Sequence, residues 1–184
     1  MKANILNRVI KTLIFAFLCI SCSSDLDFDQ VNDLKLEPVF VANLAHFNVP
    51  ANQFAVNGQA QQIASDVVDF DAFRKKFFNE NLVKAELNFE IENTINRAFT
   101  LNILLLNDND EVLQTIPLVI PAYSGSSNVI KYPTEVFENE RLVLLKQTTK
   151  VGFLIQVASG PPIDENSLGN LKLRSSATVY MEIE

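Results

Sequence analysis

Few residues in this chain could act as nucleophiles, general bases or metal ligands. His46 is the single histidine, so a Ser–His–acid triad would have to use it, yet no G-x-S-x-G turn supplies the serine. The segment Ser124-Gly125-Ser126 matches no nucleophile motif, and one histidine is too few for a zinc site. His46 shares a predicted strand face with Leu44, which favours a partly buried imidazole with a structural role. We therefore expect no catalytic residue, no metal site and no cofactor, and we expect that the protein is not an enzyme.

The carboxylates and tyrosines of the sequence could still form a glycosidase site or a sugar-binding site. Glu86, Glu90 and Glu92 alternate with apolar residues, as on a solvated strand face, whereas a glycosidase acid needs an apolar pocket that raises its pKa. A sugar site usually has an aromatic platform, and the chain has no Trp and three Tyr. Tyr123 and Tyr132, in the segment from Pro121 to Pro133, are therefore the candidate ligand-binding residues.

Five consecutive oxygen-bearing side chains, Asn107 to Glu111, are the best calcium candidate. They lack the glycine and the distal glutamate of an EF-hand loop. They also join two alternating segments, where Asn and Asp supply turn geometry. The turn is the favoured interpretation, and calcium binding there stays an open question that a calorimetric titration would answer.

Alternation of apolar and polar residues predicts at least six strands. The first has Leu36, Phe40, Ala42 and Leu44 on one face, and Val39 and Val41 make its other face apolar too, as if both were covered. The other predicted inward faces are Val83, Ala85, Leu87, Phe89 and Ile91; Phe99, Leu101, Ile103 and Leu105; Val112, Gln114, Ile116 and Leu118; Val151, Phe153, Ile155 and Val157; and alternate residues from Leu171 to Ile183. The last strand is long enough that it must pair on both sides within a sheet.

Two helical insertions are expected among these strands. The segment 69–78 has Phe70, Phe73 and Phe77 at helical spacing, and the segment from Pro133 to Lys146 has the composition of a helix start and end. Many strands, many turns and few helices predict an all-β fold, a β-sandwich of immunoglobulin-like type, as one domain over 34–184. The hallmark Cys and Trp of true immunoglobulin domains are absent from the domain.

The N-terminus has the pattern of an export signal. Lys2, Arg8 and Lys11 precede an uncharged, almost wholly apolar run from Thr12 to Ile20. That run is about half of the 20 residues that a membrane span needs. A signal peptide over 1–21, cleaved between Ser21 and Cys22, is therefore expected.

The residues around the cleavage point resemble the lipobox of bacterial lipoproteins. In Leu18-Cys19-Ile20-Ser21-Cys22, Ser21 fits the small position before an obligatory cysteine, while Cys19 stands where leucine is usual. The resemblance implies a diacylglycerol-modified Cys22, and two acyl chains suffice for stable membrane attachment. The alternative is an ordinary signal peptide with an incidental Cys22.

The acidic tether at 22–33 resembles the export tag of surface lipoproteins of Bacteroidota. Its tag-like residues are Ser23, Ser24, Asp25, Asp27 and Asp29, interrupted by Leu26 and Phe28. The resemblance implies an outer-membrane lipoprotein that faces the cell exterior. Attachment at the periplasmic face, with the tether as a plain solvated linker, is the alternative.

Charge narrows the class of partner. Removal of residues 1–21 takes away three cations and no anion, which changes the net charge from −7 to −10. This negative net charge argues against a nucleic-acid partner and against peripheral binding to a membrane of anionic lipid. The expected function is that of a non-enzymatic accessory lipoprotein that contacts a protein at the outer membrane. The alternative is a lipoprotein that captures a glycan or peptide for an importer.

The two functions predict different surfaces. The accessory function predicts a flat apolar patch and no cleft. Candidates for the patch are Leu104, Leu106, Val39 and Val41, which fall on nominally solvated strand faces. The favoured interpretation of these four residues is that the inserted helices cover them. The ligand-binding alternative predicts a concave site with exposed Tyr123 or Tyr132.

Overall fold

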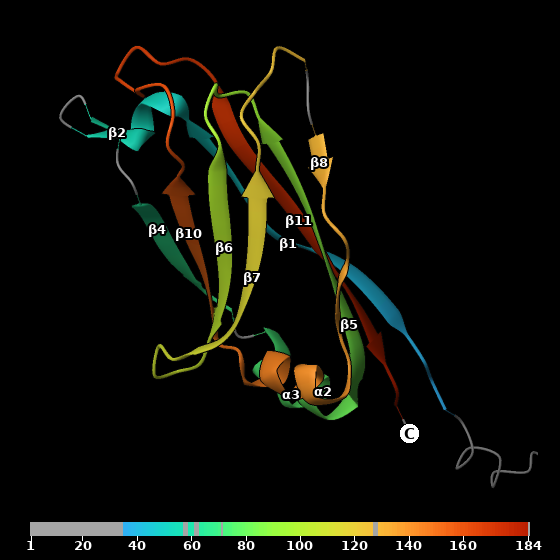
Figure 1. Cartoon of the computed structure of the whole chain (residues 1–184). Helices are drawn as coiled ribbons and strands as arrows, with labels where there is room; N and C mark the ends of the chain where they lie inside the picture. The colour runs from blue at the N-terminus through green and yellow to red at the C-terminus, as the bar shows by residue number, and fades with distance from the viewer. Residues whose placement is uncertain (1–34, 57–58, 61–62, 71, 127–128, 184) are drawn as a thin grey trace, which may run out of the picture. The chain divides into compact units, whose positions relative to one another are not determined.

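The strongly alternating segments of the sequence form the inner strands of two antiparallel sheets (Figure 1). The computed structural model describes residues 35–56, 59–60, 63–70, 72–126 and 129–183. Contacts divide the chain into residues 1–35 with Glu184 and a second unit, Leu36–Ile183, which contains every element below. The strands are β1 (Val39–Pro50), β2 (Ala55–Val56), β3 (Gln59–Ala60), β4 (Ile63–Asp69), β5 (Leu82–Asn93), β6 (Phe99–Leu106), β7 (Val112–Ile120), β8 (Val129–Lys131), β9 (Glu135–Phe137), β10 (Lys150–Val157) and β11 (Asn170–Met181). The helical segments are the 3-10 turns η2 (Ala51–Phe54) and η3 (Ala72–Arg74) and the α-helices α2 (Lys76–Asn81) and α3 (Asn139–Gln147).

The strand order defines a sandwich of two sheets. One sheet has the order β1-β11-β5-β8, and the other has the order β4-β10-β6-β7. β9 pairs with β5 just beyond β8, so the two short strands together form one interrupted edge. The expected all-β sandwich is confirmed. Its connectivity is that of a jelly roll, with the first long strand beside the last, whereas the first two strands of an immunoglobulin sheet are neighbours.

Most of the predicted inward faces form the core between the sheets. The alternating residues of β6 from Phe99 to Leu105, those of β10 from Val151 to Ile155 and those of β11 from Leu171 to Met181 are buried. β11 lies between β1 and β5, as its length predicted. Val83 is a correction: a register shift at the start of β5 turns its side chain outward, and Leu82 is buried instead.

A bulge in β1 changes which of its residues face the core. Leu44 and Ala45 together stand opposite Ser175 of β11, because the pairing shifts by one residue between Asn43 and His46. Phe47 therefore faces inward after the bulge. His46, expected on the Leu44 face and partly buried, is exposed opposite Arg174 on the outer face.

The second apolar face of β1 is not covered. Val39 and Val41, for which burial on both sides was considered, are 53% and 73% exposed. The predicted face behind them, with Leu36, Phe40 and Ala42, is exposed too, because β1 is an edge strand.

The predicted helices are shorter than expected. Residues 72–81 form η3 and α2 instead of one helix over 69–78, and Asp69 ends β4. Phe73 is buried, whereas Phe77 is 48% exposed. Pro133 precedes a strand, β9, and α3 begins only at Asn139, because residues 135–137 pair with β5. None of the described helices has the length and apolarity to cross a membrane.

The bulge yields a prediction about stability. The Ala45 N–H donates to Ser175 Oγ at 2.9 Å, and this hydroxyl donates to the Ala45 carbonyl at 2.8 Å. Ser175→Ala leaves both backbone groups without these partners, so we expect the free energy of unfolding to fall by about 1–2 kcal/mol. Urea denaturation measures it. Ser176→Ala, on the opposite face of β11, is the control, and equal losses for the two variants would refute the role of Ser175.

Candidate functional site

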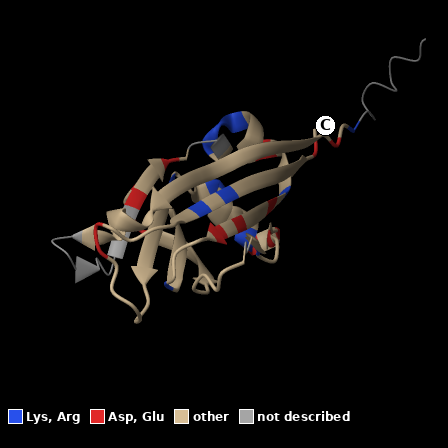
Figure 2. Ribbon diagram, turned by 90° about the horizontal axis from the view of Figure 1, so that it is seen from above, with Lys and Arg blue, Asp and Glu red and all other residues tan. Residues whose placement is uncertain are grey.

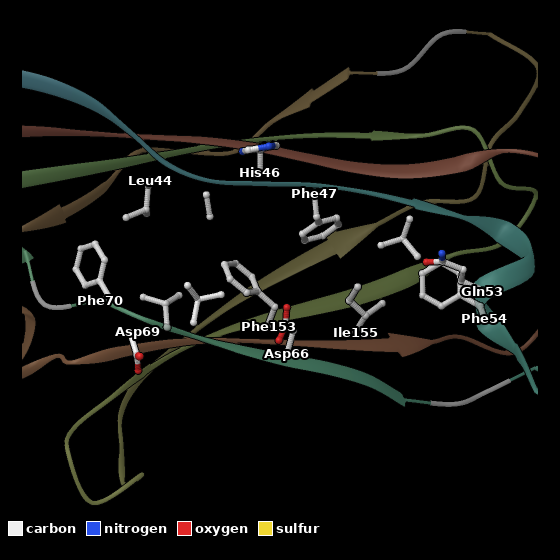
Figure 3. A pocket seen from close by; sticks show the side chains of 14 residues that line it. Leu44, His46, Phe47, Gln53, Phe54, Asp66, Asp69, Phe70, Phe153 and Ile155 are labelled. Carbon is white, nitrogen blue, oxygen red and sulfur yellow. The ribbon is translucent and has the colours of Figure 1, made fainter.

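A large hollow lies between the two sheets, on the side where β1 and β4 end them. Its volume is about 450 Å³, which falls in the usual range of ligand pockets, roughly 300–1,000 Å³. Figure 3 shows side chains of β1 and of the strands opposite projecting into this space. We call it the open cleft; it is lined by Leu44, Ala45, His46, Phe47, Val49, Gln53, Phe54, Asp66, Val68, Asp69, Phe70, Val151, Phe153 and Ile155.

The floor of the open cleft is part of the hydrophobic core. Phe153 of β10 meets Phe47 of β1 edge to face, with ring centroids 6.0 Å apart and planes at 80°. Phe54 of η2 closes one end against Phe99, at 5.0 Å between centroids. Phe70 closes the other end against Phe73. The cleft is thus an unfilled continuation of the core and not a polar groove on the surface.

The cleft is open to solvent on the side of β4, because the inner face of this strand is only partly covered. Val68 and Asp66 stand opposite the buried Val151 and Phe153, so they lie on the inner face of their sheet. Val68 is nevertheless 51% exposed. An inward-facing valine that is half solvated means that water reaches the space between the sheets.

The charged groups of the open cleft are both acidic. Asp66 lies on its inner wall and Asp69 at one end, and no Lys or Arg is among the described residues that line it. The Asp66 carboxylate accepts a hydrogen bond of 2.9 Å from the Val67 N–H. Asp69 lies near the Lys150 ammonium, whereas no described ion pair involves Asp66. A ligand with an apolar body and a positive group would suit this lining.

The candidate tyrosines do not line the cleft. The Tyr132 hydroxyl donates to the Val119 carbonyl at 2.8 Å, and the ring packs against the core. Burial raises the pKa of Tyr132 to about 12. Tyr123 is half-buried, and its N–H donates to the Ile95 carbonyl at 2.9 Å. Neither ring forms the exposed platform that the ligand-binding alternative predicted.

The segment from Asn107 to Glu111 is a turn whose side chains hold the hairpin together. Asn107 Oδ1 accepts from the N–H groups of Asn109 and Glu111, at 2.9 and 3.0 Å. Asp108 pairs with Arg74, and Asp110, which has a φ of +60°, pairs with Lys150. The favoured turn interpretation is confirmed, and no cluster of metal-ligating residues occurs within the part of the chain that the structure describes.

The outer faces of the two sheets differ in charge (Figure 2). The β11 sheet carries the ion pairs Lys84–Glu86, Lys131–Glu90 and Lys172–Glu92. The hydrogen bond from Lys84 lowers the pKa of Glu86 despite some desolvation, which is opposite to the shift that a glycosidase acid needs. The middle of the other sheet presents uncharged residues: Thr100, Asn102, Leu104, Thr115, Pro117, Val119, Gly152, Leu154 and Gln156.

The proposed apolar patch is present only in part. Leu106 is buried and Leu104 is half-buried, because both side chains lie over Gly152 of the neighbouring strand β10, which has no side chain of its own. Val39 and Val41 remain exposed at the other sheet, so the four residues do not form one patch. Sequence reasoning missed the open cleft, whose walls come from β1, β4 and β10. The lipidation and export residues Ser21, Cys22, Ser23, Ser24, Asp25, Asp27 and Asp29 lie outside the described residues.

Comparison with known proteins gives no family. No protein-family model matches the chain, and no curated protein matches it in sequence. Solved structures that match in part include VP2 of infectious bursal disease virus, with 11% identity over 78% of this chain and a TM-score of 0.45. A predicted secreted protein of Parabacteroides distasonis gives 11% identity over 64% of this chain and a TM-score of 0.43. This chain covers 32% of the viral chain and 37% of the Parabacteroides chain, and likenesses of this strength bear on no function.

Tyr132 yields a prediction about pH. The pKa of Tyr132 is higher in the folded state than in the unfolded chain. The contribution of the neutral Tyr132 side chain to the free energy of unfolding is therefore fully present below pH 10, and it is lost as the pH rises toward about 12. At neutral pH, Tyr132→Phe removes the hydrogen bond to Val119 and lowers the free energy of unfolding by about 1 kcal/mol. We expect this difference from wild type to shrink between pH 10 and 12 in denaturation series. A difference that stays constant would contradict it. Tyr123→Phe at neutral pH is the control, with an expected change within about 0.5 kcal/mol.

Proposed function

We propose that the protein is a non-enzymatic accessory lipoprotein of the outer membrane that binds a protein partner in the open cleft, a concave site in place of the flat patch expected for this function. The observation that carries the proposal is the cleft itself, an apolar hollow of about 450 Å³ that reaches the core between two strand edges. Burial of apolar surface contributes about 25 cal/mol per Å². A partner that covers Phe47 and Val68 would therefore gain free energy that the isolated domain does not gain.

The lining favours a peptide over a glycan as the occupant. Sugar sites present aromatic platforms together with hydrogen-bonding groups, and the aromatic residues of this cleft are Phe47, Phe54, Phe70 and Phe153, which offer no hydroxyl. The hydroxyl of Tyr132 is engaged elsewhere. The β4 edge beside the cleft offers backbone hydrogen bonds, which suit a polypeptide.

The attachment to the membrane rests on the sequence. The lipobox-like segment before Cys22 and the acidic tether after it support an outer-membrane lipoprotein displayed toward the exterior. With a charge of −10 after cleavage, the domain would be repelled by anionic lipid, so a covalent anchor would hold it at the bilayer.

The anchor is tested by substitution of the acylated residue. Intact-mass analysis of the native protein should show a chain that begins at Cys22 and carries acyl groups, because two chains are needed for stable attachment. Cys22→Ala should move the protein from the membrane fraction to the soluble fraction, and Cys19→Ala should not. An unmodified native N-terminus, or membrane retention of the Cys22→Ala variant, would refute the anchor.

The binding function is tested by photo-crosslinking in intact cells. A photoreactive residue replaces Gln53, an exposed residue of the cleft rim, or Gln156, an exposed residue on the uncharged face of the other sheet. We expect a discrete protein adduct from position 53 and none from position 156, each identified by mass spectrometry. An adduct from position 156 alone would move the interface to the outer sheet face, and absence of any adduct would contradict a protein partner.

A further inference from the structure

Three of the four edges of the sandwich are obstructed against a further strand. An unpaired edge is a template for pairing with another chain, and proteins commonly block it with proline, bulges or short strands. On β7, Pro117 has no N–H to offer, and the Val119 carbonyl is taken by the Tyr132 hydroxyl. The β8–β9 edge is broken into two strands of three residues each.

The β1 edge is interrupted by its bulge. The extra residue at Leu44 and Ala45 breaks the regular spacing of backbone groups, and Ser175 binds both the N–H and the carbonyl of Ala45. A regular partner strand along the full length of β1 would lose its register at that point.

The β4 edge is regular, and none of the described strands pairs with its open side along the cleft. Its pairing with β10 runs from Ile63 to Asp69 without a shift. The Phe70 N–H donates to Thr149, on the β10 side, whereas the Val67 N–H donates to the carboxylate of Asp66. Because the backbone groups of successive strand residues point to opposite sides, those of Val67 and Asp69 point toward the open edge.

Asp66 is the one obstruction on this edge, and a ligand can remove it. Its side chain lies on the inner face opposite Phe153 and folds back onto the exposed Val67 N–H. An inward-facing charge on an edge strand discourages indiscriminate pairing. A cation placed beside Asp66 would bind the carboxylate and leave the Val67 N–H free to bond a new strand.

We propose that β4 accepts an extended segment of the partner as an additional strand, with a Lys or Arg opposite Asp66 and an apolar residue opposite Val68. This inference rests on the proposed function and specifies its chemistry. Directly opposed residues share one face of a sheet, so the cation would meet Asp66 and the apolar side chain would enter the open cleft toward Phe47. The backbone bonds would supply affinity, and Asp66 would supply selectivity.

Charge favours a basic segment over a second copy of this chain. Both charged residues of the cleft lining are acidic, and the domain is acidic overall. Pairing of β4 with β4 of another copy would bring Asp66 and Asp69 of one molecule close to the same residues of the other, which is unfavourable without a cation between them.

The selectivity is tested with two synthetic peptides and the intact mature protein. Both peptides have threonine at the odd positions and valine at the second and sixth, and they carry either lysine or glutamate at the fourth. In NMR titrations we expect the lysine peptide to bind about fivefold more tightly than the glutamate peptide. Asp66→Lys should reverse the preference, and a preference that the substitution leaves unchanged overturns the proposal.

The backbone pairing is tested with proline on matched edges. Val67→Pro removes an N–H that β10 does not use, so the fold should persist, as circular dichroism and the melting temperature would show. We expect this variant to bind the lysine peptide at least about tenfold more weakly, whereas Val119→Pro, on the opposite edge of the same sheet, should bind like wild type. Normal binding by Val67→Pro, or self-association that Val67→Pro abolishes, overturns the proposal. If the crosslink from position 53 then persists in Val67→Pro, the partner occupies the cleft without strand pairing, and only this inference fails.

Discussion

The packing of two apolar sheet faces against each other is the interaction on which the rest of the structure depends. It is complete over β11, β5, β6 and β7, where alternate side chains are buried, and incomplete between β1 and β4, where the sheets end. Both cysteines of the sequence, Cys19 and Cys22, precede the sandwich, so no disulfide within residues 36–183 assists this packing. The residues that close the ends of the gap, Phe54 and Phe70, come from the segments that join β1 to β4 and β4 to η3. The same incompleteness that weakens this side of the core leaves an apolar hollow of about 450 Å³ between the sheets.

The treatment of the strand edges explains why this side could bind a partner without causing aggregation. β7, β8–β9 and β1 are each blocked by covalent or backbone features: a proline, an interruption and a bulge. These obstacles are permanent. β4 is blocked by a side chain, Asp66, whose hydrogen bond to the Val67 N–H can be exchanged for an ion pair with a ligand. A reversible block of this kind keeps the edge closed toward neutral or acidic chains and opens it for a basic one.

Sequence periodicity predicts the central strands well because both neighbours of such a strand enforce one register. The alternation in β5, β6, β10 and β11 therefore gives most of the core, and the asparagine-rich turn follows from its own side chains. Prediction from periodicity fails where a single backbone irregularity changes the face on which a side chain lies, as at His46 after the bulge and at Val83 beside the register shift. The helix near Phe70 is shorter than predicted because phenylalanines at helical spacing also serve strand ends and turns.

The open cleft could not be predicted, since its walls come from segments about 20 to more than 80 residues apart that only the jelly-roll connectivity brings together. The signal for Asp66, a charge within an apolar strand, was visible in the sequence but had no meaning without its place at a sheet edge.

Strand addition requires that the β4 edge is free to accept another strand, and hydrogen–deuterium exchange resolved at single amides measures this most directly. In the intact protein, the Val67 and Asp69 amides should exchange quickly, and the Val68 and Phe70 amides should be protected by β10. Addition of the lysine peptide should slow exchange at Val67 and Asp69 without changing Val68 and Phe70. Protection that appears instead on β7, or spreads evenly over the cleft without this alternation, would contradict strand addition at β4.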